Sequence, residues 1–512
     1  MDYHQACLAL LAALVLYLTL RGRSAIRHIL GPPSSSWIFG HMRQLLLSPQ
    51  YGEHELNWQK SYGPVYRLKG CFGEDRLMVS DPVALQYLIN SPSFSHGPVP
   101  ENVVNLLFGK KSVLGLKGEE HRRIRAALNV GFTAAAVRSY QPVFEKVARM
   151  ITEQLERTSA SSTDMCPLLG MATLGAVSEA VLGYSIEDLG DEFVESNTQV
   201  LALASGGSAA QIIVEAIWSY LPRWLLGAMI YLPTPAFHTL RQAKVDAKRL
   251  GEQIVRDKTD AANQGLEINN DVFSLLLQDT TGKALSSEEI VAQTAIILIA
   301  GQDTTSNTVA FGLLELAKHQ EFQDELRMEI YSNVEPSGPR AAYDSMPLLN
   351  AFIKEVLRLY PTEPLSDRIA LRDTVIPLAD DITTADGEQI THIPVQKGQI
   401  VTQAILSYHR LASRWGKDAN EFKPSRWLEG TTYQGDAVGP YANLLSFLGG
   451  PRTCLGWRFA LLEMQIIICE LVGKFSIAIP KNDPVQIRVT STLLPTVSSG
   501  DKGAPLCMTR IL

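Results

Sequence analysis

The stretch FLGGPRTCLGWRFALLEMQ, residues 447–465, constrains the fold more than any other part of the chain. A single cysteine, Cys454, sits among glycines beside an arginine, and an apolar run follows at once. Apolar side chains recur at three- and four-residue spacing from Trp457 onward, which predicts a buried helix ending near Gly473. Cys454 then lies at the N-terminus of this helix, where free N–H groups and the helix dipole lower the pKa of a thiol.

Several kinds of cysteine site compete for Cys454. An inert buried thiol is the expected state of Cys469, inside the helix. A structural zinc site needs further ligands at short spacing, and the nearest candidates are His409 and Cys469. A disulfide fits poorly with six scattered cysteines, while a nucleophile stays open because its histidine could come from anywhere. A single axial thiolate to haem iron explains more of the stretch, since haem needs one sulfur, closely approaching backbone and a cation for a propionate.

The same stretch resembles the haem loop of the cytochrome P450 superfamily, F-x-x-G-x-R-x-C-x-G. The matching positions are Phe447, Gly450, Arg452, Cys454 and Gly456. The resemblance implies that these residues bind haem and that Cys454 is the metal ligand.

A long apolar segment, residues 286–318, predicts a helix of about 50 Å at 1.5 Å per residue. It opens with a capping-box pattern, Ser286 to Glu289. Polar groups and a glycine over 301–305 interrupt it, which indicates either a break between two helices or a locally opened helix. The segment resembles the family's [AG]-G-x-[DE]-T-[TS] stretch, which implies that Thr304 hydrogen-bonds the bound oxygen and Asp303 helps relay protons.

Two charges, Glu355 and Arg358, stand three residues apart on one predicted helical face of FIKEVLRLYP, residues 352–361. Such pairs are usually solvated and contribute under ~1 kcal/mol, but the apolar neighbours favour burial here. The pair resembles the family's E-x-x-R, and FKPSRW (422–427) resembles the motif that completes that network. The resemblance implies that Arg426 is its third member and helps to hold the cysteine loop.

Haem propionates need cations, and the family resemblance suggests three positions for them beyond the cysteine loop. Arg125 occupies the arginine position of the family's W-x-x-x-R helix, while His121 stands where the family has tryptophan. Arg368 matches a further propionate contact by its place in SDRIALRD. On the 118–128 helix, neighbouring arginines are expected to face solvent as a positive patch for an acidic flavoprotein.

The whole chain predicts a mainly α protein with small peripheral β-sheets. Two stretches read as β-hairpins: the pair PVYRLKG and RLMVSD around CFGED, and THIPVQKGQIVTQ at 391–403. The 512 residues contain no Pro/Gly/Ser-rich linker in the interior. We therefore expect one large catalytic domain over residues 30–512.

The net charge and the N-terminal sequence indicate which partners and which cell compartment to expect for this protein. A net charge of −7 with scattered signs argues against nucleic acid. The uncharged stretch 6–20 is followed by arginines, so we expect residues 1–29 to form a membrane anchor with the catalytic domain in the cytosol. At 15 residues the stretch is short for a span, and a signal peptide competes with this reading.

The resemblance implies a haem-thiolate monooxygenase of the endoplasmic-reticulum membrane that receives electrons from an NADPH-dependent flavoprotein reductase. The apolar stretch 201–237 resembles, by position, the family's substrate-access lid, while core packing or membrane contact accounts equally for its apolar residues. A lipophilic small molecule such as a terpenoid, steroid or fatty acid is the substrate that fits best. A haem-thiolate peroxygenase or isomerase, and a tethered haem-binding protein without turnover, remain as alternatives.

Overall fold

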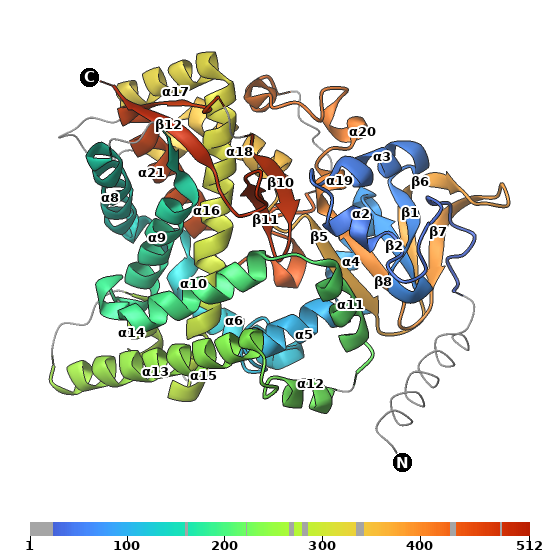
Figure 1. The fold of residues 1–512 in the computed structure, drawn as a ribbon, viewed down its shortest axis with the longest axis horizontal. Coiled ribbons are helices and arrows are strands. Elements are labelled where there is room, and N and C mark those ends of the chain that lie inside the picture. The colour runs from blue at the N-terminus through green and yellow to red at the C-terminus, as the bar shows by residue number, and fades with distance from the viewer. Residues whose placement is uncertain are drawn as a thin grey trace.

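The computed structural model describes residues 24–158, 162–221, 223–265, 271–278, 285–333, 342–430, 437–481 and 484–511. The apolar stretch of the predicted membrane anchor lies outside these residues. The described chain is mainly helical, with its sheets small and peripheral, as predicted (Figure 1). Helices fill one side of the molecule, and the largest sheet lies on the other side.

The helical side is built around α16 (Thr294–Lys318), which runs through its middle (Figure 1). Helix α9 (Met165–Val177) packs closely along it, because Gly301 carries no side chain. A Cβ at Gly301 would lie 2.8 Å from Val177 Cγ2. Helices α8 (Gln141–Arg157), α18 (Pro347–Leu359) and α21 (Trp457–Lys474) complete the core.

One helical segment among the described residues, Met165–Leu182, is long and apolar enough to cross a membrane, yet 72% of it is buried inside the protein. Burial by protein is the ordinary reason for an apolar core helix. The remaining helices are α2 (Met42–Leu46), α3 (Glu53–Tyr62), α4 (Pro82–Asn90), α5 (Pro98–Leu107), α6 (Gly118–Leu128), α7 (Ala134–Ser139), α10 (Asp191–Ser205), α11 (Ala209–Trp218), α12 (Arg223–Met229), α13 (Pro235–Asn263), α14 (Val272–Gln278), α15 (Ser287–Val291), α17 (Gln320–Asn333), α19 (Ile405–Tyr408) and α20 (Ala412–Trp415).

The predicted long helix over 286–318 is wrong in one respect. The capping box of Ser286 and Glu289 is present, but it starts the short helix α15, and the chain breaks at 292–293. Helix α16 then runs through 301–305, where we expected a break or an opening. Its hydroxyls bond back onto the helix: Thr304 Oγ1 donates to Ala300 O at 2.8 Å, and Thr308 Oγ1 to Thr304 O at 2.9 Å. These polar groups are therefore satisfied without unwinding.

The largest sheet has the order β1-β2-β8-β5-β3. Its first two strands, β1 (Val65–Lys69) and β2 (Asp75–Val79), form the first predicted hairpin. The hairpin predicted over 391–403 is wrong. Strand β7 (Gln389–Val395) pairs with β6 (Thr374–Thr383), whereas β8 (Ile400–Ala404) lies between β2 and β5 (Leu365–Ala370). Every residue of β8 is buried, which suits the middle of a sheet, while β7 is largely exposed.

Two smaller sheets lie near the C-terminus. One joins β4 (Thr163–Asp164), β12 (Pro505–Arg510) and β9 (Phe475–Ala478), and the other joins β10 (Gln486–Val489) and β11 (Leu493–Thr496). Strand β3 (Phe94–His96) forms the edge of the largest sheet and pairs with β5. This pairing places His96 directly opposite Arg368.

Candidate active site

The cysteine loop, residues 445–456, is closed by its own backbone. The Cys454 N–H donates to Phe447 O at 2.8 Å, and the Thr453 hydroxyl donates to Gly450 O at the same distance. Gly450 has φ +59°, and a Cβ there would lie 2.7 Å from Ile89 Cγ2, so both its conformation and its neighbours require glycine. Phe447 is buried beneath the loop. The loop therefore presents Cys454 in one fixed geometry.

At Gly456, unlike Gly450, neither the backbone conformation nor a close neighbour requires glycine. Its φ of −88° suits any residue, and the nearest atom that an added Cβ would meet is Phe132 Cε1 at 3.8 Å. The side of Gly456 that a Cβ would occupy is thus open next to Cys454.

The Cys454 side chain borders open space, yet surrounding protein atoms desolvate it. This desolvation raises the pKa of the thiol, against the opposing effects of the Gly456 N–H and Arg125. The N-terminus of α21 acts in the expected direction, because the N–H of its N-cap Gly456 lowers the pKa of the thiol, but the prediction of a net lowering is wrong for the protein groups alone, since desolvation outweighs it. The open space that Cys454 borders must lie inside the protein, since an outer surface would leave the sulfur hydrated.

Two of the competing cysteine sites, the disulfide and the structural zinc site, find no support in the part of the chain that the structure describes. Its cysteines are all free. No group of three or more His, Cys, Asp or Glu side chains gathers there to hold a metal ion. Cys469 is buried, and burial raises the pKa of its thiol, as expected for an inert core cysteine.

Three arginines from different segments gather near Cys454. Arg125 of α6 interacts electrostatically with the Cys454 sulfur, and Arg452 interacts electrostatically with both Arg125 and Arg368. Burial and these two neighbouring cations lower the pKa of Arg452 to about 10. Arg452 Nη2 donates to Leu116 O at 2.7 Å, and Arg368 Nε donates to Gln403 Oε1 at 2.9 Å. None of the three forms an ion pair with a carboxylate among the described residues.

Two histidines complete this group, which we call the cation cluster: His96, His121, Arg125, Arg368 and Arg452. Burial, Arg452 and Arg125 lower the pKa of His121 to about 4, so its imidazole is neutral and can donate one hydrogen bond. Burial and neighbouring arginines likewise lower the pKa of His96, to about 3. Its Nδ1 faces Arg368 Nη1 at 3.4 Å and so accepts, which leaves Nε2 as a buried donor without a partner among the described residues.

The cation cluster fits the carboxylates of haem. Close cations without acids repel one another and lower each other's pKa, so a bound dianion would relieve this cost. The orphaned Nε2–H of His96 needs an acceptor for the same reason. His96 escaped sequence reasoning because only the pairing of β3 with β5 reveals its place.

The predicted positive patch on α6 is weaker than expected. Arg122 pairs with Glu119 at 2.5 Å, and Arg123 pairs with Glu289 of the capping box. Both arginines are exposed, but each is matched by a glutamate.

Asp303 and Thr304 stand side by side in α16 but in different surroundings. Asp303 is buried and accepts from Lys502 Nζ at 2.6 Å and from Thr492 Oγ1 at 2.8 Å. Asn307 Nδ2 donates to the same carboxylate at 3.3 Å. Thr304 is partly exposed. Asp303 is thus tied to the C-terminal segment, and Lys502 is a partner that local spacing could not indicate.

Glu355 is the centre of a second charged group, which we call the Glu355 network. Arg358 forms two hydrogen bonds of 2.8 Å with the carboxylate, and Arg426 Nε adds a third at 3.0 Å. The Trp427 indole and the Lys423 N–H also donate to it. Desolvation opposes ionisation, but Arg358 and the other donors outweigh it and leave the pKa of Glu355 below its ordinary value.

His409 connects the Glu355 network to the cysteine loop. The Leu445 N–H donates to His409 Nε2 at 2.8 Å, so Nδ1 carries the proton and donates to Arg358 O at 3.1 Å. The Ser446 hydroxyl adds a bond of 2.6 Å to Leu357 O. Arg426 thus belongs to the predicted triad, and His409 supplies the physical link to the loop.

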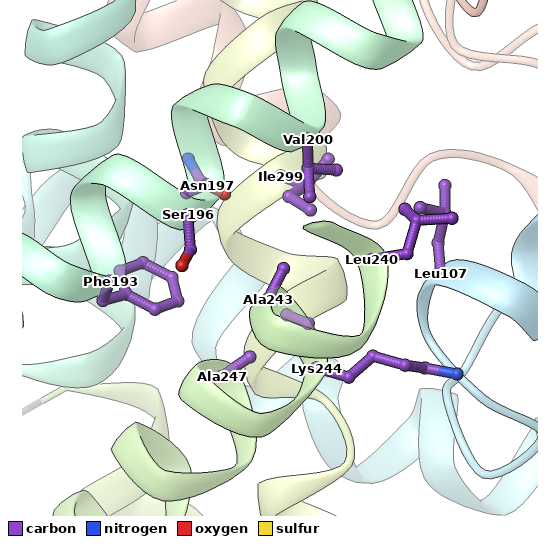
Figure 2. A pocket seen from close by; sticks show the side chains of 11 residues that line it. Leu107, Phe193, Ser196, Asn197, Val200, Leu240, Ala243, Lys244, Ala247 and Ile299 are labelled. Carbon is purple, nitrogen blue, oxygen red and sulfur yellow. The ribbon is translucent and has the colours of Figure 1, made fainter. Parts of the chain in front are cut away.

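An apolar pocket lies between α10, α13 and α16 (Figure 2). Phe193 and Val200 approach from α10, Ala243 from α13, and Ile299 from α16. Lys244 contributes its stem at one edge, and burial lowers the pKa of its ammonium group. The cavity is small, about 20 Å³, and its lining is mainly apolar.

Comparisons with known proteins agree with this geometry. The cytochrome P450 family model matches residues 30–502. Cytochrome P450 monooxygenase 219 of Postia placenta is 31% identical, over 92% of this chain and 91% of its own length. Monooxygenase 212 of the same fungus is also 31% identical, over 97% and 96%. Ganoderic acid synthetase of Ganoderma lucidum is 28% identical, over 93% and 92%. With the family matched over most of its length, this chain belongs to the cytochrome P450 family and is a cytochrome P450 monooxygenase.

Proposed function

We propose that this chain binds haem through Cys454 and uses O2 and electrons from an NADPH-dependent flavoprotein reductase to oxidise a lipophilic small molecule. The observation that carries the proposal is the fixed, inward-facing Cys454 beside a cation cluster that forms no ion pair with a carboxylate among the described residues. When bound, haem supplies the oxygen-activating redox chemistry.

The protein's own residues have separate tasks in this proposal. His96, His121, Arg125, Arg368 and Arg452 hold the two carboxylates of haem. The Glu355 network and His409 hold the cysteine loop. With haem bound, Thr304 would supply a hydroxyl that can donate or pass on a proton; in the structure this hydroxyl donates to Ala300 O. The Asp303 carboxylate accepts and passes on protons. Lys502, which is partly exposed, forms an ion pair with it.

A terpenoid or steroid substrate is the class that we propose. The stretch 201–237 is rich in apolar residues, and a relative that is 28% identical carries the name ganoderic acid synthetase. We further propose that residues 1–29 form a membrane anchor and its basic flank in the endoplasmic-reticulum membrane, with the apolar stretch 6–20 in the bilayer and the catalytic domain facing the cytosol, because the arginines follow the apolar stretch. Ile26 and Ile29 of the flank are buried in a core of the folded domain.

The test is spectroscopic. The reduced, carbon monoxide-treated protein should show the strongly red-shifted Soret band of a thiolate ligand. Cys454→Ala should abolish that band, because no other described cysteine borders the cation cluster. Cys469→Ala, which removes a buried thiol from helix α21 after the cysteine loop, should retain the red-shifted band. A band that survives Cys454→Ala would contradict the proposal.

A further inference from the structure

A second residue shares the unusual surroundings of Cys454. Glu363, in the connection from α18 to β5, has an open surface, yet surrounding protein atoms desolvate its carboxyl group. This desolvation raises the pKa of Glu363, while Arg368 and the Ser366 hydroxyl act in the opposite direction. Glu363 and Cys454 also interact electrostatically. Both residues therefore border the same interior space.

The backbone on both sides of Glu363 is held in place. The Leu493 N–H donates to Thr362 O at 2.8 Å, and the Ile405 N–H donates to Pro364 O at 2.9 Å. Thr362 Oγ1 also bonds Thr308 Oγ1 of α16 at 3.1 Å. Glu363 is therefore presented from a rigid segment, next to the helix that carries Thr304.

The carboxylate of Glu363 has weaker partners than Glu55 and Asp303 have, namely the Ser366 hydroxyl and the charge of Arg368 beyond ion-pair distance. Glu55 accepts from Tyr51 at 2.8 Å and from the Ser407 hydroxyl at 2.6 Å, and Asp303 accepts from Lys502. Within the described chain, Glu363 forms no ion pair. A desolvated carboxyl group without strong donors is costly unless a ligand supplies one.

We propose that Glu363 is a specificity-determining residue that accepts a hydrogen bond from a hydroxyl group of the lipophilic substrate. This inference rests on the proposed function and narrows it to substrates that already carry an alcohol. A substrate carboxylate would be repelled by Glu363. A substrate ammonium would have to lose its hydration inside this space, which costs far more than desolvating a neutral hydroxyl. A neutral hydroxyl avoids both penalties and satisfies the carboxyl group.

Matched ligands test the proposal in the haem-loaded full chain. The probes are androstane with androstanol and adamantane with adamantanol, and the readout is the dissociation constant from the ligand-induced Soret shift of the oxidised protein. The wild type should bind the alcohols about tenfold or more tightly than the parent hydrocarbons. Glu363→Leu should lose this preference by weakening alcohol binding alone, and Glu363→Gln should keep part of it. Glu388→Leu, which removes an exposed glutamate from the β6–β7 turn, is the control.

The outcomes separate this inference from the proposed function. A preference for alcohols that is unchanged in Glu363→Leu overturns the inference, as does equal weakening of alcohols and hydrocarbons. A wild type that binds neither alcohol more tightly than its parent also overturns it. A wild type without the thiolate carbon monoxide band instead overturns the proposed haem ligation, whichever ligands bind.

Discussion

The Glu355 network and the cation cluster are both groups of interior charges, but they are balanced in opposite ways. Glu355 has a donor for each carboxylate oxygen from Arg358, Arg426 or Trp427. The cation cluster gathers guanidinium and imidazole groups without a carboxylate at ion-pair distance among the described residues. A balanced group can hold a loop by itself. An unbalanced group needs a ligand, and this difference separates structural charges from binding charges.

Breaking the balanced group should have the largest effect. Arg358→Ala removes two charge-assisted hydrogen bonds and leaves the buried Glu355 with fewer donors. We expect the free energy of unfolding to fall by about 3–5 kcal/mol, measured by urea denaturation. The matched control is Arg122→Ala, which removes an exposed i,i+3 pair and should cost under about 1 kcal/mol. Similar losses in the two variants would contradict the distinction.

Removing one cation from the unbalanced group should weaken haem retention more than folding. We expect Arg452→Gln to speed haem transfer to apomyoglobin by about 10-fold to 100-fold, the range for one charge-assisted hydrogen bond. Unfolding of haem-free protein should change little, because the variant also relieves repulsion from Arg125 and Arg368. Loss of stability without faster haem transfer would assign Arg452 to the fold alone.

The pH dependence of stability sharpens the same comparison. The folded pKa of His121 is about 4, below the ordinary value of 6.5, so the unfolded state binds more protons between these values. The contribution of His121 to the free energy of unfolding therefore decreases as pH falls from about 6.5 to about 4. We expect His121→Gln to gain about 1–2 kcal/mol relative to wild type between pH 7 and pH 5, measured by urea unfolding. His392→Gln, at an exposed strand position, should show no such gain.

The surface arginines should give the smallest effect. Arg122 and Arg123 are each matched by a glutamate, so their net attraction for an acidic flavoprotein is small. We expect the double variant Arg122→Gln, Arg123→Gln to slow NADPH-driven haem reduction by less than about fivefold and to reduce its salt dependence. Reduction by dithionite should be unchanged. A larger loss in stopped-flow reduction at low salt would place the reductase at this face.

Short-range spacing predicted much of this molecule, and long-range pairing accounts for what it missed. The helix after Cys454, the first β-hairpin and the Glu355–Arg358 pair all depend on residues close in sequence. The second hairpin failed because alternation within 391–403 cannot show that β8 enters another sheet. Local spacing did not predict the site roles of His96, His409 and Lys502, because their partners are distant in sequence.

The composition of the Glu355 network has a consequence for synthesis on the ribosome. Its local member, Arg358, follows Glu355 by three positions, but Arg426 follows by 71. At 5–20 residues per second, Arg426 emerges about 4–14 s after Glu355. During that interval the nascent chain carries a half-satisfied carboxylate that cannot be buried stably. The cysteine loop follows later still, so its docking onto the Glu355 network is expected to be among the last steps of folding, and the chain that still lacks this docking is the species most dependent on chaperones.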